Sequence, residues 1–224
     1  MTPEQINQVI REAFQYDDYR YQKNNNILIK EPYRAEGLHK VLYQCPHCMT
    51  ESKMDSKGTE LFCTACGKRW NWNENGDLEA LEGETEFTHI PDWFHWERQQ
   101  VEKQIEEGSY RFEDEVEVFS LPRCWRYENL GKAKLIHDPA EGFRLEGNYN
   151  GSDYRICRTP LQTNSLHIEY DYCYLKPHDC VDISTENDSF YCYPDPARNC
   201  VTKLAFATEI LYEMHISRRR TAKQ

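Results

Sequence analysis

The spacing of apolar residues near the start of the chain predicts a short helix. Apolar side chains recur at three- and four-residue intervals, at Ile6, Val9, Ile10, Ala13 and Phe14. The preceding stretch TPEQ has the sequence of a helix start, with a Thr that accepts a backbone hydrogen bond, a Pro at the first helical position and a Gln that reaches back. The chain is therefore expected to open with an amphipathic helix.

Two further helices are expected later in the chain. One starts at Pro91 and Asp92 and ends at Gly108. The other spans residues 199–216, where Val201, Leu204, Thr208, Leu211 and Met214 follow helical spacing. In the first of these, Trp93, Trp96, Val101 and Ile105 lie near one face and Phe94 points elsewhere. We interpret this stripe as a packing surface, with Trp93 and Trp96 kept as weak candidates for ligand binding. Four glutamates on the polar face make a membrane-surface role the weaker interpretation.

From residue 111 onward, short runs of alternating apolar and polar residues predict antiparallel strands. The runs are EVEVFSL, WRYEN, KAKLIH, FRLEG, YRICR, SLHIEYDYCYL, CVDIS and SFYCYP. Pro, Gly, Asn or Asp fills the breaks between them, so we expect a meander. Two shorter strands are expected at residues 27–29 and 41–43.

Together these elements predict an α+β protein. Residues 1–43 would form the first helix and a connector, 44–72 a zinc ribbon, and 73–110 an acidic linker and helix. Residues 111–224 would form an antiparallel β domain closed by the C-terminal helix. About seven strands followed by one helix is the layout of a domain like the pleckstrin-homology or GRAM domains.

The net charge of the chain bears on which kinds of molecule it can bind. The 224 residues carry a formal net charge of -11, which disfavours polyanions such as nucleic acid and weakens general attraction to anionic lipid. The basic run is Arg218, Arg219 and Arg220, followed by Lys223. We interpret it as a solvated tail and keep the three arginines as weak binding candidates. The chain has neither a run of about 18 apolar residues nor a signal-peptide layout, so we expect a cytoplasmic protein.

Two Cys-x-x-Cys pairs carry the clearest chemical signal in the sequence. CPHC and CTAC place Cys45, Cys48, Cys63 and Cys66 at the spacing of a zinc ribbon. Pro46 stiffens the first turn, Gly67 suits a turn that needs positive φ, and Lys57-Gly58 marks a hairpin between the pairs. Four thiolates close the coordination shell, which predicts a structural Zn²⁺ rather than a catalytic one.

The other six cysteines show no paired spacing. They are Cys124, Cys157, Cys173, Cys180, Cys192 and Cys200. In a reducing compartment we expect them to be small buried hydrophobic residues rather than disulfides.

Other catalytic constellations are weak. A redox role for Cys45-x-x-Cys48 with His47 between them would call for a single pair on a different scaffold. The eight histidines are scattered, and the sequence holds no Gly-rich phosphate loop and no Gly-x-Ser-x-Gly motif. A catalytic site formed between distant strands stays open, so enzymatic activity is left undecided.

Three stretches resemble a known family. AEGLHKVLYQCPHC, CTACGKRW and LEALEGETEFTHIPDWFHWER are similar to the region that follows the acyltransferase domain in a group of bacterial proteins like 1-acyl-glycerol-3-phosphate acyltransferases. In that family, acyl transfer belongs to a His-x-x-x-x-Asp motif, whose histidine acts as general base. None of the histidines here has an aspartate five positions on, so no catalytic residue carries over.

The resemblance implies a non-catalytic accessory module of a phospholipid-synthesis enzyme. Such a module would position or regulate an acyltransferase domain in the same or a partner chain, or dock it to lipid or a partner at the inner face of the membrane. The alternative is a free-standing zinc-ribbon scaffold that binds protein, with nucleic acid the weaker option because the ribbon is only slightly basic.

Overall fold

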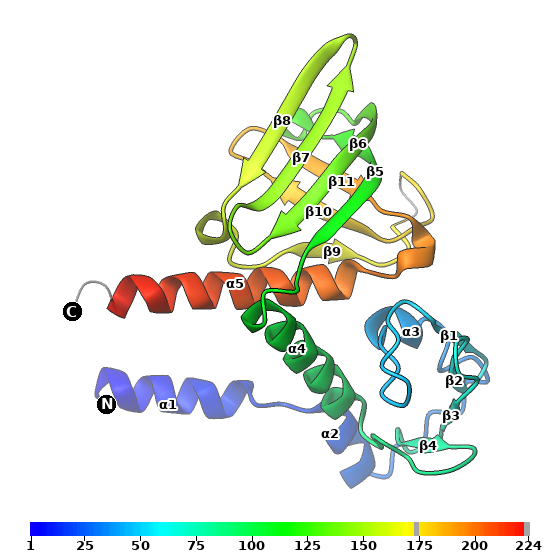
Figure 1. The fold of residues 1–224 in the computed structure, drawn as a ribbon. Helices are drawn as coiled ribbons and strands as arrows, with labels where there is room; N and C mark the ends of the chain where they lie inside the picture. Colours follow the sequence, from blue (N-terminus) through cyan, green and yellow to red (C-terminus); the bar gives the residue numbers. More distant parts are fainter. Residues whose placement is uncertain (173–174, 222–224) are drawn as a thin grey trace.

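Two antiparallel sheets and five α-helices make up the computed structural model, which describes residues 1–172 and 175–221. The larger sheet lies above helix α5 in Figure 1, and the smaller sheet lies on the other side of helix α4. The predicted α+β class and C-terminal helix are confirmed.

The smaller sheet contains four strands in the order β1-β2-β3-β4. They are β1 Met54–Lys57, β2 Glu60–Cys63, β3 Arg69–Trp72 and β4 Leu78–Ala80. Lys57 pairs with Glu60, and Gly58 between them has φ of 62°, so the predicted hairpin turn is confirmed. The fourth strand extends this sheet beyond the cysteine region.

The larger sheet has seven strands in the order β8-β7-β6-β5-β11-β10-β9. They are β5 Phe112–Ser120, β6 Glu128–Asp138, β7 Gly142–Tyr149, β8 Ser152–Arg158, β9 His167–Glu169, β10 Cys180–Ser184 and β11 Ser189–Tyr193. Strands β5 and β11, which are the first and last of the seven along the chain, pair with each other, and Tyr191 lies opposite Phe119. The expected single meander is therefore two meanders joined at β5 and β11.

Helices surround the two sheets. The α-helices are α1 Pro3–Phe14, α2 Asp18–Asn24, α3 Leu38–Val41, α4 Ile90–Glu106 and α5 Val201–Thr221. Short 3-10 turns lie at η1 Pro122–Cys124, η2 Pro160–Gln162 and η3 Pro196–Arg198. The capping box predicted at Thr2 and Gln5 is present, and Gly108 follows α4 with φ of 72°. None of the described helices is long and apolar enough to cross a membrane.

Each sheet contributes to its own hydrophobic core, and α4 reaches both. The larger core includes Val101 and Ile105 of α4 together with side chains of the seven-stranded sheet and α5. The smaller core includes Ile90 and Trp93 of α4 with side chains of the four-stranded sheet and two of the cysteines. Because one helix packs into both cores, it fixes how the two halves sit together.

Polar contacts add to this connection between the halves. The carboxylate of Glu51, beside the first cysteine pair, accepts from Gln104 Nε2 at 2.9 Å and from Lys203 Nζ of α5 at 2.6 Å. Lys40 forms ion pairs with Asp171 and Asp179 at 2.6 and 2.7 Å. The Glu51–Lys203 and Lys40–Asp179 pairs are partly shielded from water, which makes them worth more than fully exposed pairs.

Three predicted strands are wrong. Residues 27–29 form no regular element, and Val41 belongs to helix α3 instead of a strand. The run WRYEN begins in an irregular turn after η1, where Trp125 is 89% exposed, and only its last residues enter β6. An alternation of apolar and polar residues over such short runs is compatible with several backbone conformations. Tertiary contacts therefore determine which conformation forms. Cys173, in the run SLHIEYDYCYL, lies outside the described residues.

Two predictions about individual side chains also need correction. Cys124 and Cys157 are exposed, whereas Cys180, Cys192 and Cys200 are buried as expected. The run Arg218, Arg219 and Arg220 is exposed but forms the last turns of α5, not a tail. Lys223 lies outside the part of the chain that the structure describes.

Candidate metal centre

The two Cys-x-x-Cys segments fold into matching turns. In the first, the N–H of Cys45 donates to Thr50 O at 3.0 Å and the N–H of Met49 donates to Cys45 O at 2.9 Å. In the second, the N–H of Cys63 donates to Lys68 O and that of Gly67 to Cys63 O, both at 2.9 Å. The same local backbone bonds thus present two sulfurs from each turn toward the other turn.

These turns bring all four thiols together. The sulfurs of Cys45, Cys48, Cys63 and Cys66 lie within 4.8 Å of one another. Cys45 Sγ is 3.8 Å from Cys66 Sγ, and Cys48 Sγ is 3.7 Å from Cys63 Sγ. A tetrahedral ion with metal–sulfur bonds of about 2.3 Å sets its sulfurs about 3.8 Å apart. The cluster therefore fits one metal ion held by four thiolates.

The pKa values of the cysteine thiols are shifted in different directions by their surroundings. Burial raises the pKa of the Cys45 thiol, although the backbone N–H groups of Cys48 and His47 act in the opposite direction. Burial likewise raises the pKa of Cys63. For Cys48, burial is outweighed by the hydroxyl and N–H of Thr50, and its pKa falls to about 6. A divalent cation would compensate the charge that burial penalises in the deprotonated cluster.

Beside the exposed Cys66, the carboxylate of Glu86 organises the rim of the site. Lys68 Nζ donates to Glu86 Oε1 at 2.7 Å, and Trp70 Nε1 donates to Glu86 Oε2 at 3.1 Å. His47 Nδ1 lies 3.2 Å from the same carboxylate. Burial alone would raise the pKa of Glu86, but the hydrogen bond from Lys68 outweighs it and lowers that pKa. His47 is thus positioned next to Glu86 at the edge of the site.

On the buried side, Glu97 of α4 supports the first turn. Its carboxylate is 0% exposed and accepts from the N–H of Gln44, next to Cys45, at 2.7 Å. Trp93 Nε1 donates to Gln44 O at 3.0 Å. Burial raises the pKa of Glu97 well above its usual value. Sequence reasoning missed both Glu86 and Glu97, because their roles depend on tertiary contacts with residues that are distant in the chain.

The two turns differ at one equivalent position, and this difference is testable. Gly67 has φ of 79° and Met49 has φ of 64°. A Cβ added at Gly67 would meet nothing within 4 Å, so Gly67→Ala is expected to cost only the left-handed backbone strain of about 1–2 kcal/mol. Met49→Gly removes the same strain and should not destabilise the protein. Urea unfolding of the metal-loaded protein measures both; equal destabilisation by the two variants would contradict this reading of the turns.

The weaker binding candidates do not join the cysteines. Trp93 is 0% exposed and packs edge-on against Trp70 at 5.0 Å between ring centroids, so no surface is left for a ligand. Trp96 is half-buried against Phe87 at 5.7 Å. The three arginines lie at the C-terminal end of α5, which points away from the smaller sheet in Figure 1.

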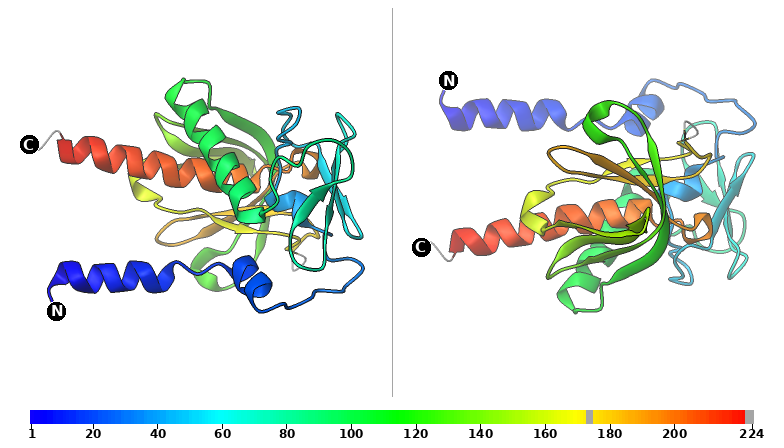
Figure 2. Two further views of the ribbon diagram at one scale, coloured as in Figure 1. Left: turned by 90° about the horizontal axis from the view of Figure 1, so that it is seen from below. Right: turned by 90° about the horizontal axis from the view of Figure 1, so that it is seen from above.

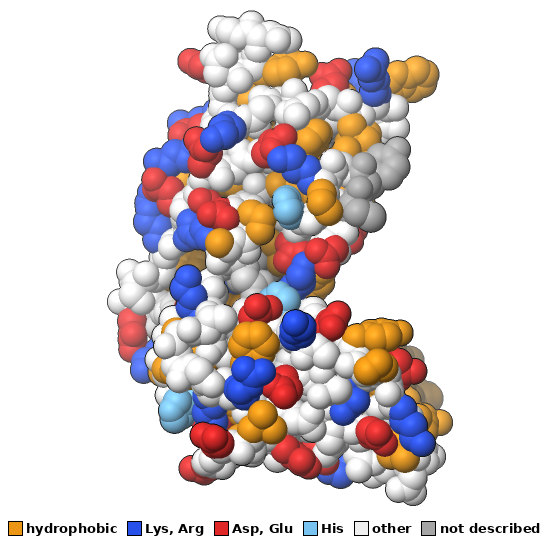
Figure 3. Space-filling view, turned by 90° about the vertical axis from the view of Figure 1, so that its right-hand side faces the viewer, with side chains coloured by type: hydrophobic (Ala, Val, Ile, Leu, Met, Phe, Trp, Pro, Cys, Tyr) orange, Lys and Arg blue, Asp and Glu red, His pale blue; other side chains and the backbone are white. Residues whose placement is uncertain are grey.

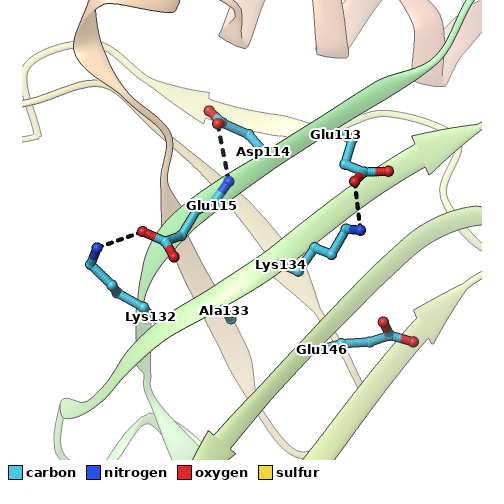
Figure 4. A pocket seen from close by; sticks show the side chains of 7 residues that line it. All are labelled: Glu113, Asp114, Glu115, Lys132, Ala133, Lys134 and Glu146. Atoms are coloured by element: carbon cyan, nitrogen blue, oxygen red, sulfur yellow. Dashed lines mark hydrogen bonds and ion pairs between the residues drawn. The ribbon is translucent and has the colours of Figure 1, made fainter.

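Two other hollows contain charged side chains. One of about 520 Å³ lies over β5, β6 and β7, where Lys132 pairs with Glu115 and Lys134 with Glu113, both at 2.5 Å (Figure 4). The other, of about 380 Å³, lies between the two halves and includes Lys40; Figure 3 shows the molecule hollowed between an upper and a lower part. In both, the charged groups named here are held in ion pairs. At the second hollow, His39 Nδ1 also lies 2.7 Å from the Ser56 hydroxyl and 3.8 Å from Asp55.

The sequence matches no known protein-family model, and a search of curated proteins finds no match either. The class of the protein therefore follows from its structure. It is an α+β protein with two antiparallel sheets and a four-cysteine candidate metal centre.

Proposed function

We propose that this chain is a non-catalytic accessory module of a phospholipid-synthesis protein that resembles the bacterial 1-acyl-glycerol-3-phosphate acyltransferases. In this proposal Zn²⁺ is the ion at Cys45, Cys48, Cys63 and Cys66, and the four-stranded sheet is a zinc ribbon. The seven-stranded sheet with α5 is a pleckstrin-homology-like or GRAM-like docking domain. The module positions the acyltransferase domain at the cytoplasmic face of the membrane.

One observation carries the proposal: the four sulfurs surround a single point, within 4.8 Å of one another. Four protein ligands leave an ion no open position for water or substrate, so the chemistry of such a site is structural. Zinc is the ion that four cysteines in two Cys-x-x-Cys turns favour. The resemblance to the family then supplies the enzyme that the scaffold would serve.

The four-cysteine turns also stand at the junction of the two halves. Cys45 and Cys63 belong to the smaller core, and Glu51, six residues after Cys45, binds Lys203 of α5. An ion that fixes the first turn therefore also fixes the position of Glu51 relative to the larger sheet. This is the role expected of a structural clamp in a module that holds domains in a set orientation.

The proposal is tested by assaying the isolated chain with an acyl donor and lysophosphatidate, alone and with a separately purified acyltransferase from the same bacterial group. The expected result is no acyl transfer by the chain alone, and a complex between chain and enzyme that sedimentation detects. Turnover by the chain alone would contradict the non-catalytic role. Absence of a complex, with the metal bound, would favour a free-standing scaffold instead.

A further inference from the structure

Helix α1 leaves its apolar stripe in contact with water. None of its 12 residues is buried, and Ile6, Val9, Ile10 and Phe14 are 45%, 52%, 47% and 83% exposed. These four side chains share one face of the helix, while Glu4, Gln8 and Arg11 lie on the opposite face. The helix is amphipathic, yet among the described residues none of its side chains belongs to either hydrophobic core.

A helix of 12 residues is only marginally stable in water when it is isolated. Isolated helices shorter than about 12–15 residues are marginal even when they are rich in alanine. The segment contains two isoleucines, a valine and an asparagine, which are weaker helix formers than alanine. The capping box at Thr2 contributes only about 1 kcal/mol. A stable α1 therefore implies an apolar surface against which the stripe is covered.

A second feature lies on the same side of the molecule. Helices α1 and α5 run roughly parallel and extend beyond the body in the same direction, with a gap between them in each view (Figures 1 and 2). The overhanging end of α5 carries Arg218, Arg219 and Arg220, all exposed. Among the described residues none of the three forms an ion pair, although the chain as a whole has a net charge of -11. Three arginines without an ion pair and the apolar stripe of α1 thus lie toward the same end of the molecule.

We propose that α1 and the arginine end of α5 form a contact surface for a bilayer that contains anionic phospholipid. Helix α1 would lie at the headgroup boundary with its stripe toward the acyl chains, as interfacial amphipathic helices do. The guanidinium groups would meet lipid phosphates, which they bind in a bidentate manner. This inference rests on the proposed function, to which it adds the surface and the charge of the lipid.

A bilayer fits the surface better than a second copy of the chain does. Each partner in a stable dimer buries roughly 800 Å², far more than four half-exposed side chains on a short helix supply. A bilayer needs no matching relief, and α1 is free to adjust because only Gln15, Tyr16 and Asp17 connect it to α2. A bilayer also covers the apolar stripe and neutralises the arginines at once.

Co-sedimentation with vesicles tests the proposal. The metal-loaded protein is mixed with vesicles of phosphatidylcholine alone or with one-third phosphatidylglycerol, at low and at physiological salt. Binding is expected only to the anionic vesicles and should weaken with salt. The double variant Val9→Gln, Ile10→Gln should bind at least tenfold more weakly, whereas Gln8→Ala on the polar face should bind like wild type. Glutamine is a good helix former, so the loss would reflect the stripe and not helix propensity.

A variant with Arg218, Arg219 and Arg220 all changed to Gln gives an independent measurement. Each arginine near an anionic surface is worth about fivefold in binding, so the expected loss is at least tenfold and the salt dependence should flatten. Binding that survives both sets of substitutions would overturn the assigned surface but leave lipid docking intact. No vesicle binding, or a wild-type dimer that the stripe variant turns into a monomer, would overturn the inference itself. In either case the metal clamp and the complex with the acyltransferase would be unaffected.

Discussion

Replacing Cys63 with Ala will unfold the smaller core, whereas replacing Cys192 with Ala will not. Both thiols are almost fully buried, at 1% and 0% exposed, so each substitution removes a similar apolar group. Only Cys63 belongs to the four-sulfur cluster. Structural zinc sites contribute about 10–16 kcal/mol of apparent binding free energy, which in small domains is also folding free energy. Loss of one ligand should therefore exceed what the four-stranded sheet can tolerate.

Amide hydrogen exchange followed by mass spectrometry measures this effect along the chain. In Cys63→Ala, and in wild type treated with a strong chelator, protection should disappear from β1, β2 and β3 and persist in β5, β6 and β7. Cys192→Ala should lose about 1–2 kcal/mol uniformly, as a small buried truncation does. If Cys63→Ala and Cys192→Ala behaved alike, the cluster would contribute no more than ordinary packing.

The second large effect is a dependence of stability on pH that comes from His137. Burial lowers the pKa of this histidine from 6.5 to about 3. Its ring stacks on Phe143 at 3.9 Å and its Nδ1 is hydrogen-bonded to the Tyr110 hydroxyl at 2.8 Å. Since the folded state resists protonation, its contribution is complete above about pH 6.5 and is lost as the pH falls toward 3. At about 1.4 kcal/mol per unit over about 3.5 units, the total loss is on the order of 5 kcal/mol.

His137→Asn isolates this effect, because the amide oxygen can still accept from Tyr110 but does not titrate. The variant should be less stable than wild type at pH 7, where it lacks the stacked ring. The difference should then shrink by about 1.4 kcal/mol for each unit as the pH is lowered from 6 to 4. Urea unfolding of both proteins, followed by a probe of the larger sheet, gives this difference directly. A gap that stays constant over the range would show that His137 does not govern acid sensitivity.

Local features of the sequence predicted that four cysteines lie close together. The Cys-x-x-Cys spacing, Gly67 and the hairpin at Gly58 act over a few residues, so the four cysteines could be assigned before any tertiary contact was known. The capping box of α1 is local in the same sense. What lies around the sulfurs was not predictable, because Glu86 and Glu97 reach the cysteine turns from other elements.

Long-range pairing accounts for most of what the sequence did not predict. The register of β5 with β11 joins residues about 70 positions apart, and no periodicity within either strand indicates that partner. Helical spacing separated Trp93 from Phe94, yet it could not show that the first turns of α4 join the smaller core while Val101 and Ile105 join the larger one. Phe94 packs on Phe206 of α5 at 4.6 Å between ring centroids, while Trp93 packs in the smaller core.

The most direct test of the metal clamp is the metal content of the purified protein, combined with X-ray absorption at the zinc edge. Our proposal predicts one zinc ion per chain, surrounded by four sulfurs at about 2.3 Å and by no nitrogen or oxygen ligand. A protein that folds fully without a bound metal ion, or an ion with fewer than four sulfur neighbours, would contradict it.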